Sequence, residues 1–333
     1  MNNVVGTENK LFTCDLGNGM TELVIPIFGD NLLSGMAYAA SPVCVDMSDG
    51  QKREIVFVLS NLVTKIANKI IYYTIDHLPK SLNDEQNKVA FAFLQRAATF
   101  HICNHKISSE GITTERFGKE CKLVDEYKTM PLTRSVYEHL AMFYYLFHYT
   151  DDQNQREIIW KSWILGSKTN LLKDSGPEYK KERAKAKKEY EDILTILRNN
   201  KFVKKCLSNP SGKFEECLNS LAVFSVNRKG PQYVAEKLTY DKAWKYLYGS
   251  NIEIHSLLYN YLSMHSHPTY NGLLQFCSQD ENIEFPLYES CYFLAYLCRL
   301  FMKHFQIDNN VILSSFSERD QEIFMYLSNG MIV

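Results

Sequence analysis

Apolar residues that recur every three or four positions are the feature that most constrains this chain. Between Asp49 and about His77 they include Ile55, Val58, Leu62, Ile66 and Ile70, which fall on one face of a helix with 3.6 residues per turn. The 333 residues include only 15 Gly and 9 Pro, so residues that break helices or form tight turns are scarce. These features predict an all-α fold, a multi-helix bundle.

Further helices are expected along the chain. One should begin at Ser81, with Asp84 and Glu85 in its first turn, where carboxylates interact favourably with the helix dipole. Another should carry Pro131 in its first turn, because proline suits that position. The remaining helices are expected over residues 154–170, 176–199, 213–223, 231–248, 252–266, 286–306 and 317–328.

The N-terminal residues 1–47 differ from the rest of the chain. They contain five glycines, short apolar runs and few charges, which predicts an irregular arm or cap with a strand near 23–28. Changes in pattern divide the remainder into an N-terminal helical region (48–128), a core helical domain (129–306) and a C-terminal helix with its tail (307–333).

Charge and cysteine content limit the class of protein. Lys plus Arg (37) nearly equals Asp plus Glu (38), which disfavours a nucleic-acid binder that works by bulk charge alone. Nine cysteines without a C-x-x-C fit neither a disulfide framework nor a zinc ribbon. The N-terminus lacks the features of a signal peptide, and the densest apolar run, residues 140–147, is too short to span a bilayer. We therefore expect a soluble, cytoplasmic protein with no membrane partner.

Polar residues inside an apolar helix form the first half of a candidate site. Arg134 and Glu138 are four residues apart, so they share a helix face and can form an ion pair. His139 follows Arg134 by five residues, which places it about 140° further around the helix.

A second apolar segment carries the other half of this site. Tyr259, Ser263 and His267 recur at a spacing of four, so they line one helix face. Pro268 should end that helix, leaving His265 and His267 near its C-terminus, where the dipole favours a charged imidazole. The simplest explanation for polar groups on two apolar helices is that they contact each other. We therefore expect them to form one shared cluster.

These motifs resemble a bacterial family catalogued as domain of unknown function, family 5677. The resemblance covers roughly residues 130–275. It consists of an R-x-x-x-E helix at Arg134, a Trp-bearing helix, a Lys/Glu-rich connecting helix, and a Y-x-x-L-S-x-x-x-H motif that begins at Tyr259. It implies a helical fold and a place to look for a site, without a reaction.

The Arg134-x4-His139 spacing also resembles the R-x4-6-H signature of the HEPN superfamily. That superfamily includes metal-independent ribonucleases of toxin–antitoxin and anti-phage systems, in which arginine and histidine of two protomers converge at a dimer interface. The resemblance implies that His139 acts as general acid or base and that Arg134 stabilises charge on phosphoryl oxygens. It also implies RNA as a partner, a homodimer and a role in defence.

The same residues have non-catalytic interpretations. Arg134 and Glu138 can be a structural ion pair, His139 a packed histidine, and Ser263 with His267 a helix-capping contact. The favoured interpretation is a HEPN-like ribonuclease or toxin with Arg134 and His139 as catalytic residues and the others in support. The alternative is a non-catalytic helical module that binds a protein partner or small ligand through the cluster.

A lysine-rich helix is the strongest nucleic-acid feature of the sequence. Lys180, Lys181, Arg183, Lys187 and Lys188 are spaced to contact phosphates. Glutamates are interleaved with them, so a solvated helix held by ion pairs four residues apart is the alternative.

Other chemistry has little support in the sequence. His101 and His105 are one helical turn apart, as in some metal sites, but the glutamate of the zinc-protease H-E-x-x-H motif is missing. We expect a packed or solvated pair. There is no phosphate-binding G-x-x-x-x-G-K-[ST], no dinucleotide-binding G-x-G-x-x-G and no hydrolase G-x-S-x-G. We therefore expect neither a metal nor a cofactor.

Overall fold

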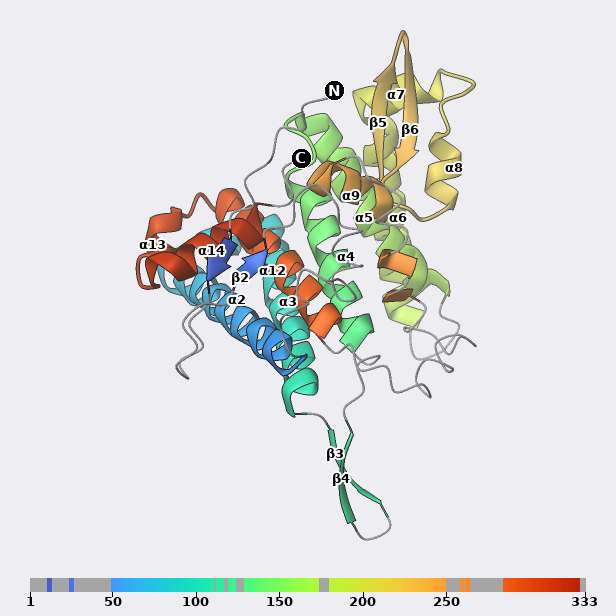
Figure 1. Cartoon of the computed structure of the whole chain (residues 1–333). Coiled ribbons are helices and arrows are strands. Elements are labelled where there is room, and N and C mark those ends of the chain that lie inside the picture. Colours follow the sequence, from blue (N-terminus) through green and yellow to red (C-terminus); the bar gives the residue numbers. More distant parts are fainter. Residues whose placement is uncertain are drawn as a thin grey trace, which may run out of the picture. The chain divides into compact units, whose positions relative to one another are not determined.

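The computed structural model describes most of the helical part of the chain. The described residues are 49–110, 129–173, 180–249 and 284–329, with the short segments 11–13, 24–26, 112–116, 119–123, 258–260 and 262–263. Within these residues helices predominate, and the sheets are small two-stranded ones (Figure 1). The predicted all-α, multi-helix fold is confirmed.

Contacts between residues group the chain into two compact units. Unit 1 comprises residues 1–140 and 244–333, and unit 2 comprises residues 141–243. The four-part division made above follows changes in sequence pattern rather than contacts, and it stays a prediction.

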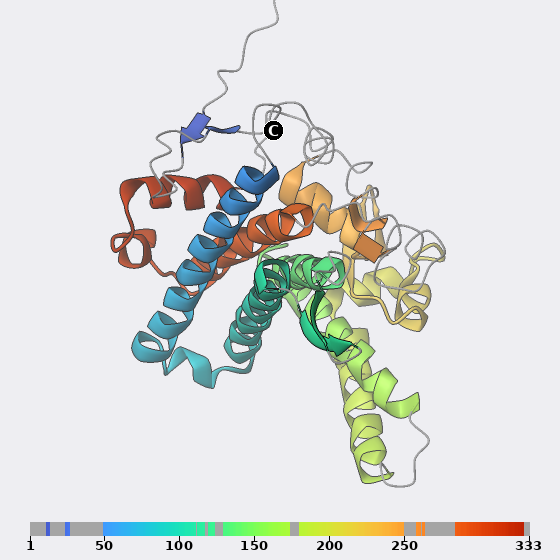
Figure 2. The same cartoon turned by 60° about the horizontal axis from the view of Figure 1, so that its bottom comes forward.

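Unit 1 is built around the helix α12 (Glu284–His304). This helix packs against α2 (Asp49–His77), α3 (Glu85–Glu110) and α14 (Glu318–Ser328). Figure 2 shows α12 (orange) beside α2 (blue) and α3 (teal). The apolar stripe of α2 is buried in this core as its periodicity predicted, with Ile70 fully buried, except for Val58, which is 37% exposed.

The start of α3 differs from the prediction. Ser81–Asn83 forms a short 3-10 helix, η2, and the α-helix begins only at Glu85. The reason is the Asp84 side chain, whose carboxylate accepts a hydrogen bond from the backbone N–H of Asn87 at 3.0 Å. An aspartate in this role satisfies an otherwise unpaired N–H of the first turn, so the helix starts one turn later than expected.

The short strands of unit 1 were only partly predicted. β1 (Leu11–Thr13) pairs antiparallel with β2 (Val24–Pro26), which confirms the strand expected near residues 23–28. β3 (Ile112–Arg116) pairs antiparallel with β4 (Lys119–Leu123), a hairpin that the helical pattern did not reveal. A short helix, α13 (Asn309–Leu313), precedes α14.

Buried polar side chains link the central helices of unit 1. His101 on α3 is fully buried. Its Nε2 lies 2.9 Å from the Ser60 hydroxyl of α2, and its Nδ1 lies 2.7 Å from the Ser290 hydroxyl of α12. Burial lowers the pKa of His101 to about 4. The ring is therefore neutral at pH 7, and it joins three helices by hydrogen bonds rather than by charge.

A second set of buried hydrogen bonds connects α4 (Thr129–Phe147) to α3 and α12. Asn104 of α3 donates to the Thr133 hydroxyl at 2.8 Å, and that hydroxyl donates to the carbonyl of Pro286 at 2.7 Å. Pro131 lies in the first turn of α4, as predicted. Since each polar group has a partner, burial of these side chains does not leave an unpaired donor.

Unit 2 has its own apolar core. α5 (Gln153–Lys173) and α6 (Lys180–Asn199) pack against each other, followed by α7 (Lys201–Leu207) and α8 (Phe214–Asn219). The buried residues of this core are Ile158, Leu165, Ile193, Leu197, Val203, Cys206, Phe214, Cys217, Leu218, Phe224, Val226 and Ala235. The helix expected over 154–170 is confirmed, and the helix expected over 176–199 is confirmed from Lys180, since residues 176–179 lie outside the described residues.

A β-hairpin replaces part of a predicted helix in unit 2. β5 (Phe224–Lys229) and β6 (Gln232–Lys237) pair antiparallel. Gly230 has a φ of +60°, a conformation that glycine adopts without strain, and Pro231 completes the two-residue turn. The helix predicted over 231–248 is therefore wrong at its start, and only α9 (Tyr240–Tyr248) is helical.

One described stretch, Glu54–His77 of α2, is long and apolar enough to cross a membrane by length and composition. Half of its most apolar window is buried inside the protein, as in the core helix of a soluble bundle. The cytoplasmic location stays a prediction.

Glu289 of α12 makes stability depend on pH. It is 5% exposed, and burial raises its pKa from 4.5 to about 8. The folded protein then keeps a proton that the unfolded chain releases above pH 4.5, so stability falls as pH rises from about 4.5 to 8. Glu289→Gln should remove this loss, raising the unfolding free energy at pH 8 by on the order of 4 kcal/mol relative to the native chain.

Urea unfolding followed by circular dichroism at pH 5 and pH 8 measures this difference. The matched control is Glu322→Gln, which changes an exposed carboxylate on α14. A Glu289→Gln protein that loses as much stability between the two pH values as the control would contradict the assignment.

Candidate functional site

Arg134 and Glu138 form an ion pair on one face of α4. The Nε atom of Arg134 donates to Oε1 of Glu138 at 2.8 Å. Their side chains are 24% and 28% exposed, so the pair is largely withdrawn from water but still accessible. The helical spacing of four residues predicted this contact.

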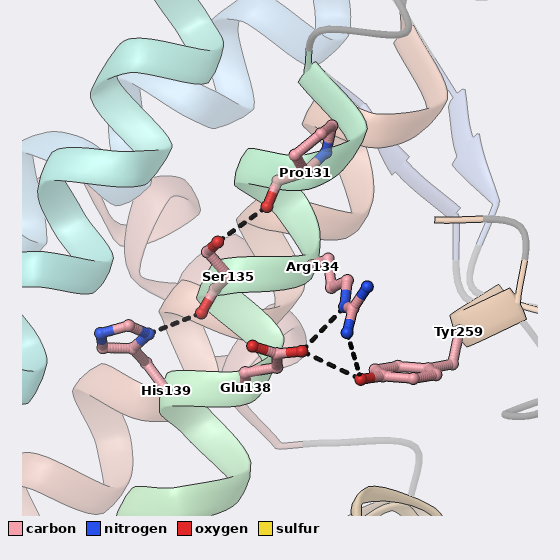
Figure 3. Close-up of polar contacts among 6 residues, drawn as sticks. All are labelled: Pro131, Arg134, Ser135, Glu138, His139 and Tyr259. Carbon is pink, nitrogen blue, oxygen red and sulfur yellow. Dashed lines mark hydrogen bonds and ion pairs between the residues drawn. The ribbon is translucent and has the colours of Figure 1, made fainter. Parts of the chain in front are cut away.

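Tyr259 completes the group from a segment 125 residues further along the chain. Its hydroxyl accepts a hydrogen bond from Nη2 of Arg134 at 2.8 Å and donates one to Oε1 of Glu138 at 2.9 Å. The guanidinium also lies 4.8 Å from the centre of the tyrosine ring, within cation–π range. Figure 3 shows this closed arrangement, here called the α4 cluster.

Ser263 and the two later histidines complete the list of expected neighbours. Ser263 follows Tyr259 by four residues and is half-buried. His265 and His267 lie outside the described residues. Of the second predicted segment, the structure therefore brings Tyr259 to the ion pair.

His139 points away from the α4 cluster, as Figure 3 shows. Its Nδ1–H donates to the backbone carbonyl of Ser135 at 2.7 Å. Its ring makes edge contacts with Phe93 and Phe100 of α3, with centroid distances of 5.6 and 5.3 Å. Within one chain, Arg134 and His139 are thus turned to different sides of the helix, as their spacing of five residues implied.

The electrostatics of the α4 cluster fix its charges near neutral pH. Burial lowers the pKa of Arg134, but the hydrogen bond and charge of Glu138 and the contact with Tyr259 raise it overall. Burial and the Glu138 carboxylate raise the pKa of the Tyr259 phenol to about 12. Burial lowers the pKa of His139. At pH 7 the cluster therefore holds a charged guanidinium and a protonated phenol.

The α4 cluster lies at the edge of an aromatic core. Tyr137 of α4 contacts the Tyr259 ring at a centroid distance of 6.2 Å and the Phe293 ring of α12 at 5.1 Å. Trp244 of α9 is 5.7 Å from Tyr137. Because Tyr259 contacts both Tyr137 and the ion pair, the cluster holds the segment 258–260 against α4.

The lysines of α6 have the exposure that contact with phosphates requires. Lys180, Lys181, Lys187 and Lys188 are exposed, whereas Arg183 is half-buried. None of these four lysines forms an ion pair with another residue that the structure describes. Of the ion pairs expected along this part of α6, the structure shows the Lys185–Glu189 contact at 3.9 Å. Lys168 of α5 also binds Glu189.

His101 and His105 are joined by a hydroxyl. Both lie within 2.9 Å of the Ser60 Oγ atom, through Nε2 and Nδ1 respectively. Among the described residues, no group of three His, Cys, Asp or Glu side chains is arranged to hold a metal ion.

Sequence reasoning gave no role to Lys205 and Arg228, two exposed cations of unit 2. With Tyr233 they line one hollow between the end of α7 and the hairpin. The signal in the sequence was a pair of turns, Asn209–Pro210 and Gly230–Pro231, which flank these residues. Helical periodicity assigned the second turn to the edge of a helix, so the proximity was missed.

Comparison with known proteins leaves the geometry as the basis for assigning a function. None of the family models, curated proteins or solved structures compared with this chain matches it. The resemblances to family 5677 and to the HEPN superfamily stay predictions.

The α4 cluster should contribute stability as a coupled unit. Tyr259→Phe removes a hydroxyl that bonds both partners and should cost about 1 kcal/mol of unfolding free energy. Arg134→Ala leaves Glu138 with a single partner and should cost about 2 kcal/mol, less than for a fully buried pair, since the side chains are about a quarter exposed.

Chemical denaturation of both single variants and the double variant forms a double-mutant cycle. Contact between the two side chains predicts a coupling energy above about 0.5 kcal/mol. Additive effects of the two substitutions would show that the contact contributes nothing.

Proposed function

We propose that this protein is a non-catalytic helical module that binds RNA through its basic unit 2. The observation that carries the proposal is the set of four exposed lysines on α6 that have no ion-pair partner among the described residues. Unpaired cations on one surface attract the phosphate backbone and release its bound counterions.

The distribution of charge supports this proposal. Residues 141–243 contain nineteen Lys or Arg against thirteen Asp or Glu, a net charge of +6, although the whole chain has a net charge of −1. Unit 2 is therefore basic, although the net charge of the whole chain is close to zero. A local excess of this kind can attract polyanions even when bulk charge cannot.

The arrangement of the lysines on α6 strengthens the argument. At about 100° per residue, Lys180 and Lys187 lie within about 20° of each other around the axis, and Lys181 and Lys188 form a second such pair about 100° further round. Each pair is separated by about 10.5 Å along the axis, so the four form a strip on the outward face. Glu182 lies about 100° beyond the second pair, and Glu191 follows Lys187 by about one turn, so the acidic residues nearest the strip lie at its border and at its C-terminal end.

The α4 cluster supports a non-catalytic interpretation. Arg134 is engaged by Glu138 and Tyr259, and His139 is turned away from it. An arginine that must stabilise a phosphoryl group needs donors directed at that group. In this chain the cluster serves to hold unit 1 together, with Glu138 and Tyr259 as structural partners.

Fluorescence anisotropy with a labelled single-stranded RNA tests the proposal. Replacing Lys180, Lys181, Lys187 and Lys188 by Gln should weaken binding at least tenfold at 100 mM salt. Each lost phosphate contact should also reduce the slope of log affinity against log salt by about 0.7.

The matched control for that experiment removes four exposed lysines from unit 1, at positions 65, 88, 106 and 303. This variant should bind RNA like the native chain. Equal loss in both variants, or no RNA binding by the native chain, would reject the proposal. Tighter binding to poly-glutamate than to RNA would point to an acidic protein partner instead.

A metal-independent ribonuclease is the second candidate, and one observation favours it. The hydrogen bond from Nδ1 of His139 to the Ser135 carbonyl fixes the tautomer, and the lowered pKa keeps the ring neutral. Its Nε2 lone pair can then accept a proton, as a general base requires. The arginine would have to come from a second copy of the chain.

Cleavage of end-labelled RNA in the presence of EDTA tests this candidate. If His139 is the base, His139→Gln should lower the cleavage rate at least a hundredfold while the melting temperature changes little. A rate that is unchanged in His139→Gln, or absent in the native chain, would exclude the ribonuclease.

A further inference from the structure

Unit 2 contains a hollow between the end of α7 and the β5–β6 hairpin. Its volume is about 550 Å³, within the range of small-molecule sites. It is lined by Lys205, Ser208, Asn209, Pro210, Arg228, Pro231, Gln232 and Tyr233. All of these residues belong to unit 2, and they lie well away in sequence from the lysine strip of α6.

The wall of this hollow is held in place by hydrogen bonds. The side-chain amide of Asn209 donates to the Tyr233 carbonyl at 3.0 Å, and the backbone N–H of Ala235 donates to the Gly212 carbonyl at 2.7 Å. A Cβ on Gly212 would lie 2.1 Å from the Cys206 carbonyl oxygen, so the close approach requires glycine. The loop after α7 is thereby fixed to β6.

The charged groups of the hollow are all positive. Lys205 and Arg228 line it, and its eight lining residues include no Asp or Glu. Neither cation forms an ion pair with another described residue, and Arg228 uses only Nε, which donates to the Gly230 carbonyl at 3.0 Å. The terminal nitrogens of the guanidinium and the Lys205 amine thus remain available as donors.

Tyr233 is a neighbour of both cations. It is the cross-strand partner of Arg228 in the hairpin, so both side chains lie on one face of the two-stranded sheet. The Lys205 amine lies 4.9 Å from the centre of the Tyr233 ring, whose other contact is a stack with Phe202 at 5.5 Å. The cation–π contact positions Lys205 without neutralising it.

From this geometry we propose that the hollow binds a phosphate monoester. Two unpaired cations match the charge of about −2 that a terminal phosphate carries near pH 7, whereas an internal phosphodiester carries only −1. A guanidinium suits the phosphate oxygens because its donors form a planar fork. The ligand is either a free mononucleotide or the phosphorylated end of an RNA strand, and the second source rests on the RNA binding proposed above.

Isothermal titration calorimetry of the full-length chain tests the proposal. The probes are 5′-AMP, adenosine, inorganic phosphate, and one short RNA with either a 5′-phosphate or a 5′-hydroxyl. AMP should bind at least tenfold more tightly than adenosine. The Lys205→Gln, Arg228→Gln double variant should lose that preference.

The matched control is the double variant Lys201→Gln, Lys204→Gln, which removes two charges from the same helix outside the hollow. It should keep the preference for AMP. Equal binding of AMP and adenosine, no binding of any phosphate probe, or equal losses in both double variants would overturn the proposal. A preference for 5′-phosphorylated over 5′-hydroxyl RNA identifies the strand end as the source, and its absence identifies the free nucleotide.

The test of phosphate binding in the hollow can be distinguished from the test of RNA binding by α6. The four-lysine variant of α6 leaves the hollow unchanged, so it should still bind AMP with the native preference. RNA that binds through α6 while AMP binds no more tightly than adenosine would leave RNA binding intact and remove the hollow as a site.

Discussion

An arginine side chain that is about three-quarters buried needs partners for its donors, and this need organises the predicted site of unit 1. Arg134 obtains one partner from its own helix, Glu138, and another from Tyr259, 125 residues away. The same bonds that attach the segment 258–260 to α4 also occupy the arginine. The arginine that the sequence favoured for catalysis is therefore engaged in holding the fold, whereas other cations have no ion-pair partner among the described residues.

Those cations are in unit 2. Unit 1 carries eighteen Lys or Arg against twenty-five Asp or Glu, and unit 2 carries an excess of six positive charges. In unit 1 the buried polar side chains of His101 and Thr133 have hydrogen-bond partners within the unit. In unit 2 the lysine strip of α6 and the hollow at Lys205 and Arg228 leave charge unneutralised. Phosphate is a ligand that such charge recognises.

Local patterns predicted some of these features and not others. The stripe of α2 and the Arg134–Glu138 pair follow from a period of 3.6 residues, so the sequence was sufficient for both. Tyr259 was expected from polarity within an apolar segment. The hairpin 224–237 was missed because its β6 residues also fit a helical pattern. The hollow depends on the contact of two turns, which no periodicity encodes.

Mass-spectrometric footprinting of lysines with an acetylating reagent, with and without RNA, tests the central claim most directly. This method reports the reactivity of each lysine amine separately in the intact chain. The account predicts that RNA protects Lys180, Lys181, Lys187 and Lys188 from modification, whereas Lys65 and Lys303 of unit 1 react at the same rate in both samples. Uniform protection of all lysines, or protection confined to unit 1, would contradict it.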